Sequence, residues 1–164
     1  MKNYAGFTVV ELLVTIFLAG VLVTLAVPAF FNMIQNQRAT TQANNLVTAI
    51  NVARSEANRR GLNVEICAAD AAQDDCAGTA VWEGNGWLVQ EEGSGDVIRV
   101  WDAPGTGIRI DADGTDRLVF RSNGELDGGG TTTINLNPVD CSGDQQRVIR
   151  VNAAGRPSVR REDC

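Results

Sequence analysis

The side chains that could do chemistry in this chain of 164 residues are carboxylates, arginines and cysteines. Histidine is absent, and the only lysine is Lys2. Without histidine there is no Ser-His-Asp or Cys-His nucleophile system and no imidazole ligand for a metal. Without a lysine farther along the chain there is no P-loop lysine and no Schiff base. Enzymes can still work with carboxylates alone, but their commonest catalytic groups are missing, so we expect a protein that is not an enzyme and that needs no cofactor or metal.

Arginines in the last part of the sequence are the one group that could bind a ligand. They are Arg147, Arg150, Arg156, Arg160 and Arg161. Residues 147–164 hold these five cations against two acids, whereas residues 62–146 hold sixteen acids against four arginines. On a strand Arg147 and Arg150 point to opposite faces, and the other three flank a Gly-Pro turn, so only part of the group can converge. This segment is therefore either a small basic patch that attracts DNA phosphates or a solvated strand face.

Glu11 is the single charge in the twenty-five residues from Phe7 to Phe31. As a helix this segment is roughly 37 Å long, enough to cross a hydrocarbon core of about 30 Å. No small-residue cleavage site follows it closely, so we expect it to be retained as a membrane helix. An unpaired carboxylate there is costly and needs a partner, which a new α-amino group on Phe7 would supply after cleavage at Gly6. The alternative is a hydrated Glu11 near the membrane interface.

The apolar segment is expected to continue as one helix to Arg60. Apolar residues recur every three or four positions from Ala39 to Ala57, which is typical of an amphipathic helix. Gly61 follows two arginines and is a suitable C-cap. Pro28 cannot donate a hydrogen bond to the Thr24 carbonyl, so we expect a kink there.

After Gly61 the sequence is typical of β-structure, with short β-branched or aromatic runs separated by Gly, Asn and Asp. Strands are expected near residues 63–69, 87–90, 97–101, 108–110, 117–121, 131–136 and 147–151. Asn85-Gly86 and Asn123-Gly124 are hairpin-type turn signals. The predicted fold class is α+β: a long N-terminal helical spine, half membrane-spanning and half amphipathic, packed on a C-terminal antiparallel β-rich head.

The run GFTVVE at residues 6–11, followed by the long apolar helix, resembles the prepilin signature of type IV pilins and type II secretion pseudopilins. Further segments resemble the GspH/FimT/FimU branch of this superfamily. They are ARSEANRRG (53–61), NGWLV (85–89), LVFRSNGEL (118–126) and VNAAGRPSV (151–159). The resemblance implies the pilin fold, with a leader at 1–6, a transmembrane and assembly helix at 7–31, an amphipathic helix at 32–60 and a periplasmic head at 61–164.

Function and partners also follow from this resemblance. In the family a membrane-embedded prepilin peptidase cuts after the glycine, here Gly6, and methylates the new N-terminal residue, here Phe7. The glutamate, here Glu11, pairs with the N-terminus of a neighbouring subunit. The implied protein is a non-enzymatic minor pilin or pseudopilin of the bacterial inner membrane that helps initiate or cap a type IV pilus or a type II secretion pseudopilus. Some FimT-type members bind DNA through a C-terminal Gly-Arg-x-Arg motif, which Gly155-Arg156 matches only in part.

Four cysteines, Cys67, Cys76, Cys141 and Cys164, allow three disulfide pairings. We favour Cys67 with Cys76 and Cys141 with Cys164. The periplasm is oxidising, and each bridge there contributes about 3 kcal/mol by closing a loop. Zinc is the competing interpretation, but the chain has no Cys-x-x-Cys pair and no histidine.

Overall fold

The structure, a computed structural model, describes residues 8–164 of the chain. Gly6 and Phe7, where the sequence predicts cleavage and methylation, lie outside the described residues. The first element is the 52-residue helix α1 (Val9–Arg60). It ends at Gly61, whose φ of +67° suits glycine and whose N–H donates to the Ala57 carbonyl at 3.0 Å. The single helix predicted from the apolar periodicity is therefore confirmed.

The chain divides into two compact units, Met1–Ile34 and Gln35–Cys164. The described part of the first unit consists of α1 alone, after Thr8. Its large apolar side chains are exposed, and its most apolar window has a mean hydropathy of 2.5. By length and composition α1 can cross a membrane. The helix continues on both sides of Pro28, which has no N–H for the Thr24 carbonyl; the kink there stays a prediction.

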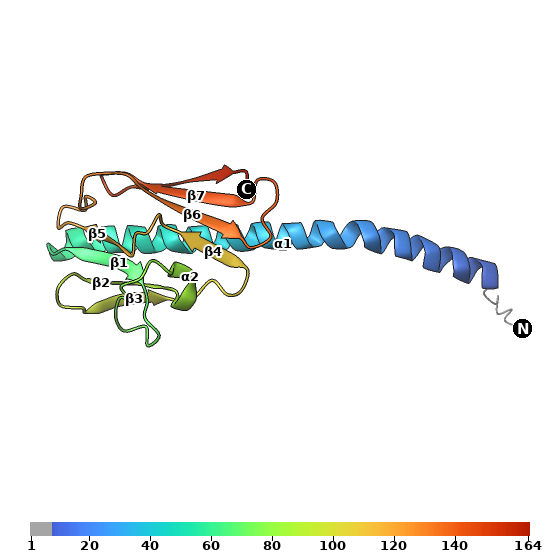
Figure 1. The fold of residues 1–164 in the computed structure, drawn as a ribbon, viewed down its shortest axis with the longest axis horizontal. Coiled ribbons are helices and arrows are strands. Elements are labelled where there is room, and N and C mark those ends of the chain that lie inside the picture. The colour runs from blue at the N-terminus through green and yellow to red at the C-terminus, as the bar shows by residue number, and fades with distance from the viewer. Residues whose placement is uncertain (1–7) are drawn as a thin grey trace, which may run out of the picture. The chain divides into compact units, whose positions relative to one another are not determined.

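Two antiparallel four-stranded sheets make up most of the second unit. Sheet 1 has the order β3-β2-β1-β5 and sheet 2 the order β4-β6-β7-β8. The strands of sheet 1 are β1 (Val64–Ala68), β2 (Trp87–Glu91), β3 (Val97–Trp101) and β5 (Arg117–Phe120). Those of sheet 2 are β4 (Ile108–Asp111), β6 (Thr132–Pro138), β7 (Gln146–Val151) and β8 (Pro157–Glu162). The short helix α2 (Trp82–Asn85) precedes β2, and Figure 1 shows the two sheets on either side of the C-terminal half of α1.

One apolar core joins α1 to both sheets. The small residues Ala39, Ala43 and Ala53 on α1 are buried, and their short side chains let the strands approach the helix closely. The predicted stripe from Ala39 to Ala57 therefore does face the chain's own sheets. Trp82 and Trp87 are fully buried in this core.

The two favoured disulfides, Cys67–Cys76 and Cys141–Cys164, are both present, which confirms the predicted pairing. The first ties the loop after β1 back onto sheet 1, where it covers Leu88. The second ties the residues after β8 to the connection between β6 and β7. All four thiols are used, so the zinc interpretation has no free ligand among the cysteines.

Strand β8 and helix α2 were not expected from the sequence. The segment PSVRRE of β8 is almost fully exposed along its length and pairs only with β7, so it has no alternation of buried and exposed residues to reveal it. Pro157 is its first residue, a position where the missing N–H costs no ladder bond inside the sheet. Tertiary pairing, not local pattern, makes this segment a strand.

Candidate functional site

Glu11 occupies the third position of α1, in the first turn. Its backbone N–H donates to Oγ1 of Thr8 at 3.2 Å, so Thr8 is the N-cap and the pair has the Thr-x-x-Glu spacing of a capping box. A carboxylate here also lies at the positive end of the helix dipole. Glu11 thus has a local role in starting the helix, which the spacing in the sequence could have revealed. Its side chain is exposed and free to meet another molecule.

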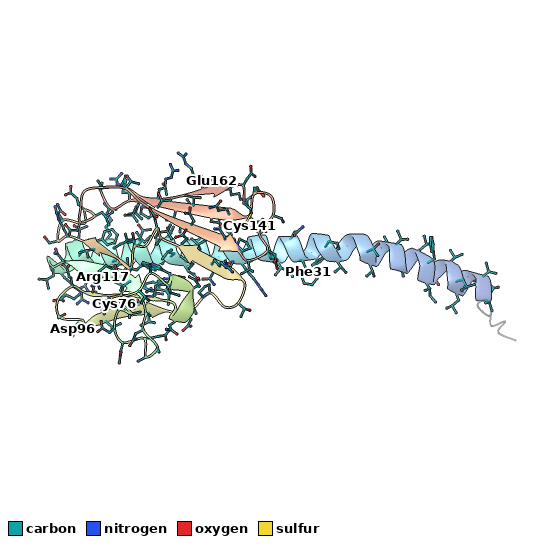
Figure 2. All side chains as sticks on the ribbon, in the orientation of Figure 1. Phe31, Cys76, Asp96, Arg117, Cys141 and Glu162 are labelled. Atoms are coloured by element: carbon teal, nitrogen blue, oxygen red, sulfur yellow. A yellow bond between two sulfur atoms is a disulfide. The ribbon has the colours of Figure 1, made fainter. Side chains whose placement is uncertain are left out.

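The apolar surface of the first unit is nearly continuous around the helix. Phe30 and Phe31 are 68% and 62% exposed, and with Val27 and Ile34 they line an apolar depression of about 300 Å³. Figure 2 shows Phe31 projecting from the helix. An apolar surface of this extent requires lipid or other apolar helices around it. The geometry therefore supports a helix that functions inside a membrane or a helical bundle.

Arg147 does not lie on the surface, so the expectation that it contacts DNA is wrong. It is 2% exposed, and its guanidinium donates to the carbonyl of Asp144 at 2.9 Å and to Oγ1 of Thr40 at 3.2 Å, and also to Oδ1 of Asn36. Burial lowers the pKa of Arg147, and the nearby Arg161 cation lowers it further. Arg147 is a structural residue that connects β7 to α1, and no local pattern in the sequence distinguished it from its neighbours.

The other four arginines are exposed but do not converge. Arg160 and Arg161 are consecutive on β8 and point to opposite faces. Arg161 is 3.4 Å from Asp144, and Arg150 is 4.0 Å from Glu162. Arg156 lies in the turn between β7 and β8. Two of the four cations thus have a carboxylate neighbour, and the geometry does not assemble a phosphate-binding patch.

Three of the segments that carry the family resemblance meet in space. Nε of Arg54 donates to the Gly124 carbonyl at 3.3 Å, and the Leu126 N–H donates to the Ala153 carbonyl at 2.9 Å. Gly155 has a φ of +71°, and a Cβ placed on it would lie 2.3 Å from the Gly124 carbonyl oxygen. The end of α1, the turn after β5 and the β7–β8 hairpin therefore form one junction, which requires glycine at residue 155.

A helix with an exposed apolar N-terminal part, whose C-terminal part is built into two antiparallel sheets, defines a pilin-like protein. The sequence supports this class twice: residues 1–27 match the prokaryotic N-terminal methylation motif, and residues 42–155 match the family model of the type II transport protein GspH. The chain belongs to the GspH family. The resemblance predicted from the sequence is thereby confirmed, and it links the protein to type IV pili or type II secretion.

Solved structures show the same fold. The type IV minor pilin FimU of Pseudomonas aeruginosa PAO1, in its P21 crystal form, superposes with a TM-score of 0.62 at 22% identity over 76% of this chain and 89% of FimU. Its P65 crystal form gives a TM-score of 0.59 at 23% identity, over 74% and 91%. A search of the curated proteins gave no match. The predicted pilin fold is confirmed.

Proposed function

We propose that this protein is a non-enzymatic minor subunit that helps to initiate or cap a type IV pilus or a type II secretion pseudopilus. The observation that carries the proposal is the methylation motif at residues 1–27 directly continuous with the exposed apolar helix. Such a helix anchors the chain in the inner membrane before assembly and packs among other subunits' helices afterwards. The head, residues 61–164, then lies in the periplasm, where its two disulfides are stable.

Processing by prepilin peptidase is the first step of this proposal. Cleavage after Gly6 leaves an N-methylated Phe7, so the chain recovered from fibres or membranes should begin at Phe7. Mass spectrometry of the native protein measures this directly. Recovery of Met1 or Lys2 on chains extracted from assembled fibres would contradict it.

Glu11 carries the second step, because its charge is proposed to pair with the N-terminal amine of a neighbouring subunit. Glu11→Gln keeps the backbone N–H that Thr8 caps and removes only the negative charge. We expect normal membrane insertion, a folded head, and loss of most incorporation into the fibre, measured by immunoblot of sheared fibres. Thr8→Ala is the matched control: it removes the cap, costs about 1 kcal/mol of helix stability and should leave incorporation largely intact. Normal incorporation of Glu11→Gln would refute the charge-pairing step.

The role in initiation is tested by counting fibres. Deletion of the gene should reduce the number of fibres or the amount of secreted substrate, without changing the length of the fibres that do form, because an initiating subunit acts once per fibre. Electron microscopy of fibres and an assay of secreted protein distinguish the two machines. Normal fibre number and normal secretion together would refute the initiation role.

A further inference from the structure

An acidic hollow of about 400 Å³ lies on the outer face of sheet 1. Its floor is the cross-strand pair Glu65 and Gln90, which the β1–β2 register places opposite one another. Asp75 and Arg117 form two of its sides, and the Gly93–Gly95 loop between β2 and β3 forms another. Figure 2 shows Arg117 and Cys76, which also lines the hollow, on this side of the head. Neither Glu11 nor the apolar N-terminal part of α1 lines this hollow.

The floor of the hollow holds buried polar groups in a fixed arrangement. Glu65 and Gln90 are each 3% exposed. Nε2 of Gln90 donates to Oε1 of Glu65 at 2.8 Å and to Oδ1 of Asp75 at 3.3 Å. The amide cannot be reversed, because its oxygen would then face two carboxylates. Among the described residues, Oε1 of Gln90 consequently has no hydrogen-bond donor, although a buried carbonyl normally has one.

Charge in the hollow is compensated at one carboxylate and not at the other. Nη1 of Arg117 lies 3.2 Å from Glu65, and its Nη2 lies 3.2 Å from Asp116, so this cation serves two anions. Among residues 8–164, the donors to the Asp75 carboxylate are neutral: the Cys76 N–H at 2.7 Å and the Gln90 amide at 3.3 Å. The surrounding sequence is strongly acidic: residues 61–106 hold nine acids against one arginine, Arg99, which lies over the Trp101 ring. The hollow therefore has a local excess of negative charge.

The walls of the hollow are held in place before any partner arrives. The Cys67–Cys76 disulfide fixes Asp75 next to the sheet. The hairpin loop is closed by the Gly95 N–H, which donates to the Glu91 carbonyl at 3.1 Å. A site whose groups are already positioned loses little conformational entropy when it binds.

We propose that the acidic hollow binds an arginine or lysine side chain of a neighbouring pilin-like subunit in the fibre. This inference rests on the proposed function, since it needs a fibre neighbour. A cation with several N–H donors supplies what both the Asp75 carboxylate and the Gln90 carbonyl lack. A divalent metal fits less well, because only one carboxylate is uncompensated.

The exposed cations of sheet 2 that have no carboxylate neighbour, Arg156 and Arg160, do not reach the hollow from within the same head. Arg156 and Arg160 belong to the β7–β8 hairpin of sheet 2, whereas the hollow lies on the outer face of sheet 1, across α1 (Figure 1). Arg99 on β3, in the same sheet as the hollow, already lies over the Trp101 ring, 4.8 Å from its centroid. We therefore look for the cation on another molecule.

The test uses the full chain, expressed from its own gene in place of the wild type. Asp75→Arg reverses the uncompensated charge and should lower the amount of the chain in purified fibres at least tenfold. Asp74→Arg is the matched control: it makes the same change one residue away, at an exposed position that does not line the hollow, and should leave incorporation unchanged. Ser94→Arg places a cation at the rim of the hollow and leaves the buried floor unchanged. It should lower incorporation into fibres as Asp75→Arg does, and it provides the test if Asp75→Arg does not fold.

A photo-crosslinking residue at Ser94 identifies the occupant. The expected adduct is a peptide of another pilin-like subunit with an arginine or lysine at the crosslink, and reversal of that cation to aspartate should restore incorporation of Asp75→Arg. Equal behaviour of Asp75→Arg and Asp74→Arg, an adduct from a second copy of this chain, or an adduct without a cation would each overturn the inference. If the wild type is itself absent from fibres, the proposed function fails; if it is present and Ser94→Arg has no effect, only the assignment of the hollow fails.

Discussion

At the scale of single residues, Arg147 shows how a charge is used inside the head. Its side chain lies between β7 and the part of α1 that carries Asn36 and Thr40. The guanidinium donates to neutral oxygens, namely the carbonyls of Asp144 and Gln146, Oδ1 of Asn36 and Oγ1 of Thr40. The hydrogen bonds position the start of the second unit's helix against sheet 2, and their loss would leave several buried acceptors without donors.

Arg147→Met should therefore destabilise the head, because methionine fills a similar volume but donates no hydrogen bond. We expect the free energy of unfolding to fall by about 2–4 kcal/mol, measured by urea denaturation of the full chain in detergent. Arg150→Met is the matched control on the same strand; Arg150 is exposed, and its replacement should change the value by less than about 0.5 kcal/mol. If both variants lower the free energy of unfolding equally, the hydrogen bonds of Arg147 do not stabilise the contact between β7 and α1.

Glu56 gives the head a stability that depends on pH. Hydrogen bonds from Arg59 and then Arg60 lower the pKa of Glu56 from 4.5 to about 2. Because the folded pKa is depressed, the stabilisation is fully present above the unfolded pKa near 4.5 and is lost as the pH falls toward 2. Because solvent screens the two exposed arginines, we expect their ion pairs with Glu56 to add only about 0.5–1 kcal/mol to the free energy of unfolding at neutral pH.

The measurement is the difference in unfolding free energy between the wild type and Glu56→Gln across this pH range. The difference should be constant above about pH 5 and should disappear near pH 2. A difference that grows on acidification would contradict the sign of this prediction.

At the scale of elements, the junction of α1, the β5 turn and the β7–β8 hairpin depends on one glycine. Gly155→Ala must strain a φ of +71° and also places a Cβ 2.3 Å from the Gly124 carbonyl oxygen. Gly143→Ala is the matched control, since Gly143 has a φ of +59° but open space around it. We expect the free energy of unfolding to fall by about 1 kcal/mol in Gly143→Ala and by about 3 kcal/mol or more in Gly155→Ala. Thermal denaturation measures both changes as lower midpoints. Equal losses of stability in the two variants would mean that the close approach of residue 155 to the Gly124 carbonyl adds no strain.

At the scale of the whole molecule, the charge distribution argues against nucleic acid as a partner. The chain carries a net charge of −6, and of the five arginines near its end only Arg156 and Arg160 are both exposed and without a carboxylate neighbour among the ion pairs of the described residues. Two phosphate contacts give weak binding with a shallow salt dependence. We expect no measurable affinity for duplex DNA at about 0.15 M salt, by fluorescence anisotropy with the full chain in detergent. Binding that Arg156→Gln with Arg160→Gln abolishes would restore the DNA-receptor alternative.

The sequence by itself determined the features that depend on local pattern. Apolar periodicity predicted one helix to Arg60, and short β-branched runs with turn residues predicted seven of the eight strands to within two residues at their ends. Of the three possible cysteine pairings, the favoured one is the one that forms. The methylation motif is also local, because it lies within the consecutive residues 1–27. These properties belong to short segments, so composition and spacing suffice to identify them.

The tertiary structure alone decided which faces and neighbours those segments have. Strand β8 exists because β7 pairs with it, not because of its own pattern, and this pairing separates Arg160 from Arg161. Arg147 and Arg150 look alike in the sequence, yet α1 buries the first and leaves the second in solvent. The acidic hollow likewise needs β1 to bring Glu65 opposite Gln90 and a disulfide to bring Asp75 beside them. The physical reason is that burial and charge compensation depend on long-range register, which no short stretch of sequence encodes.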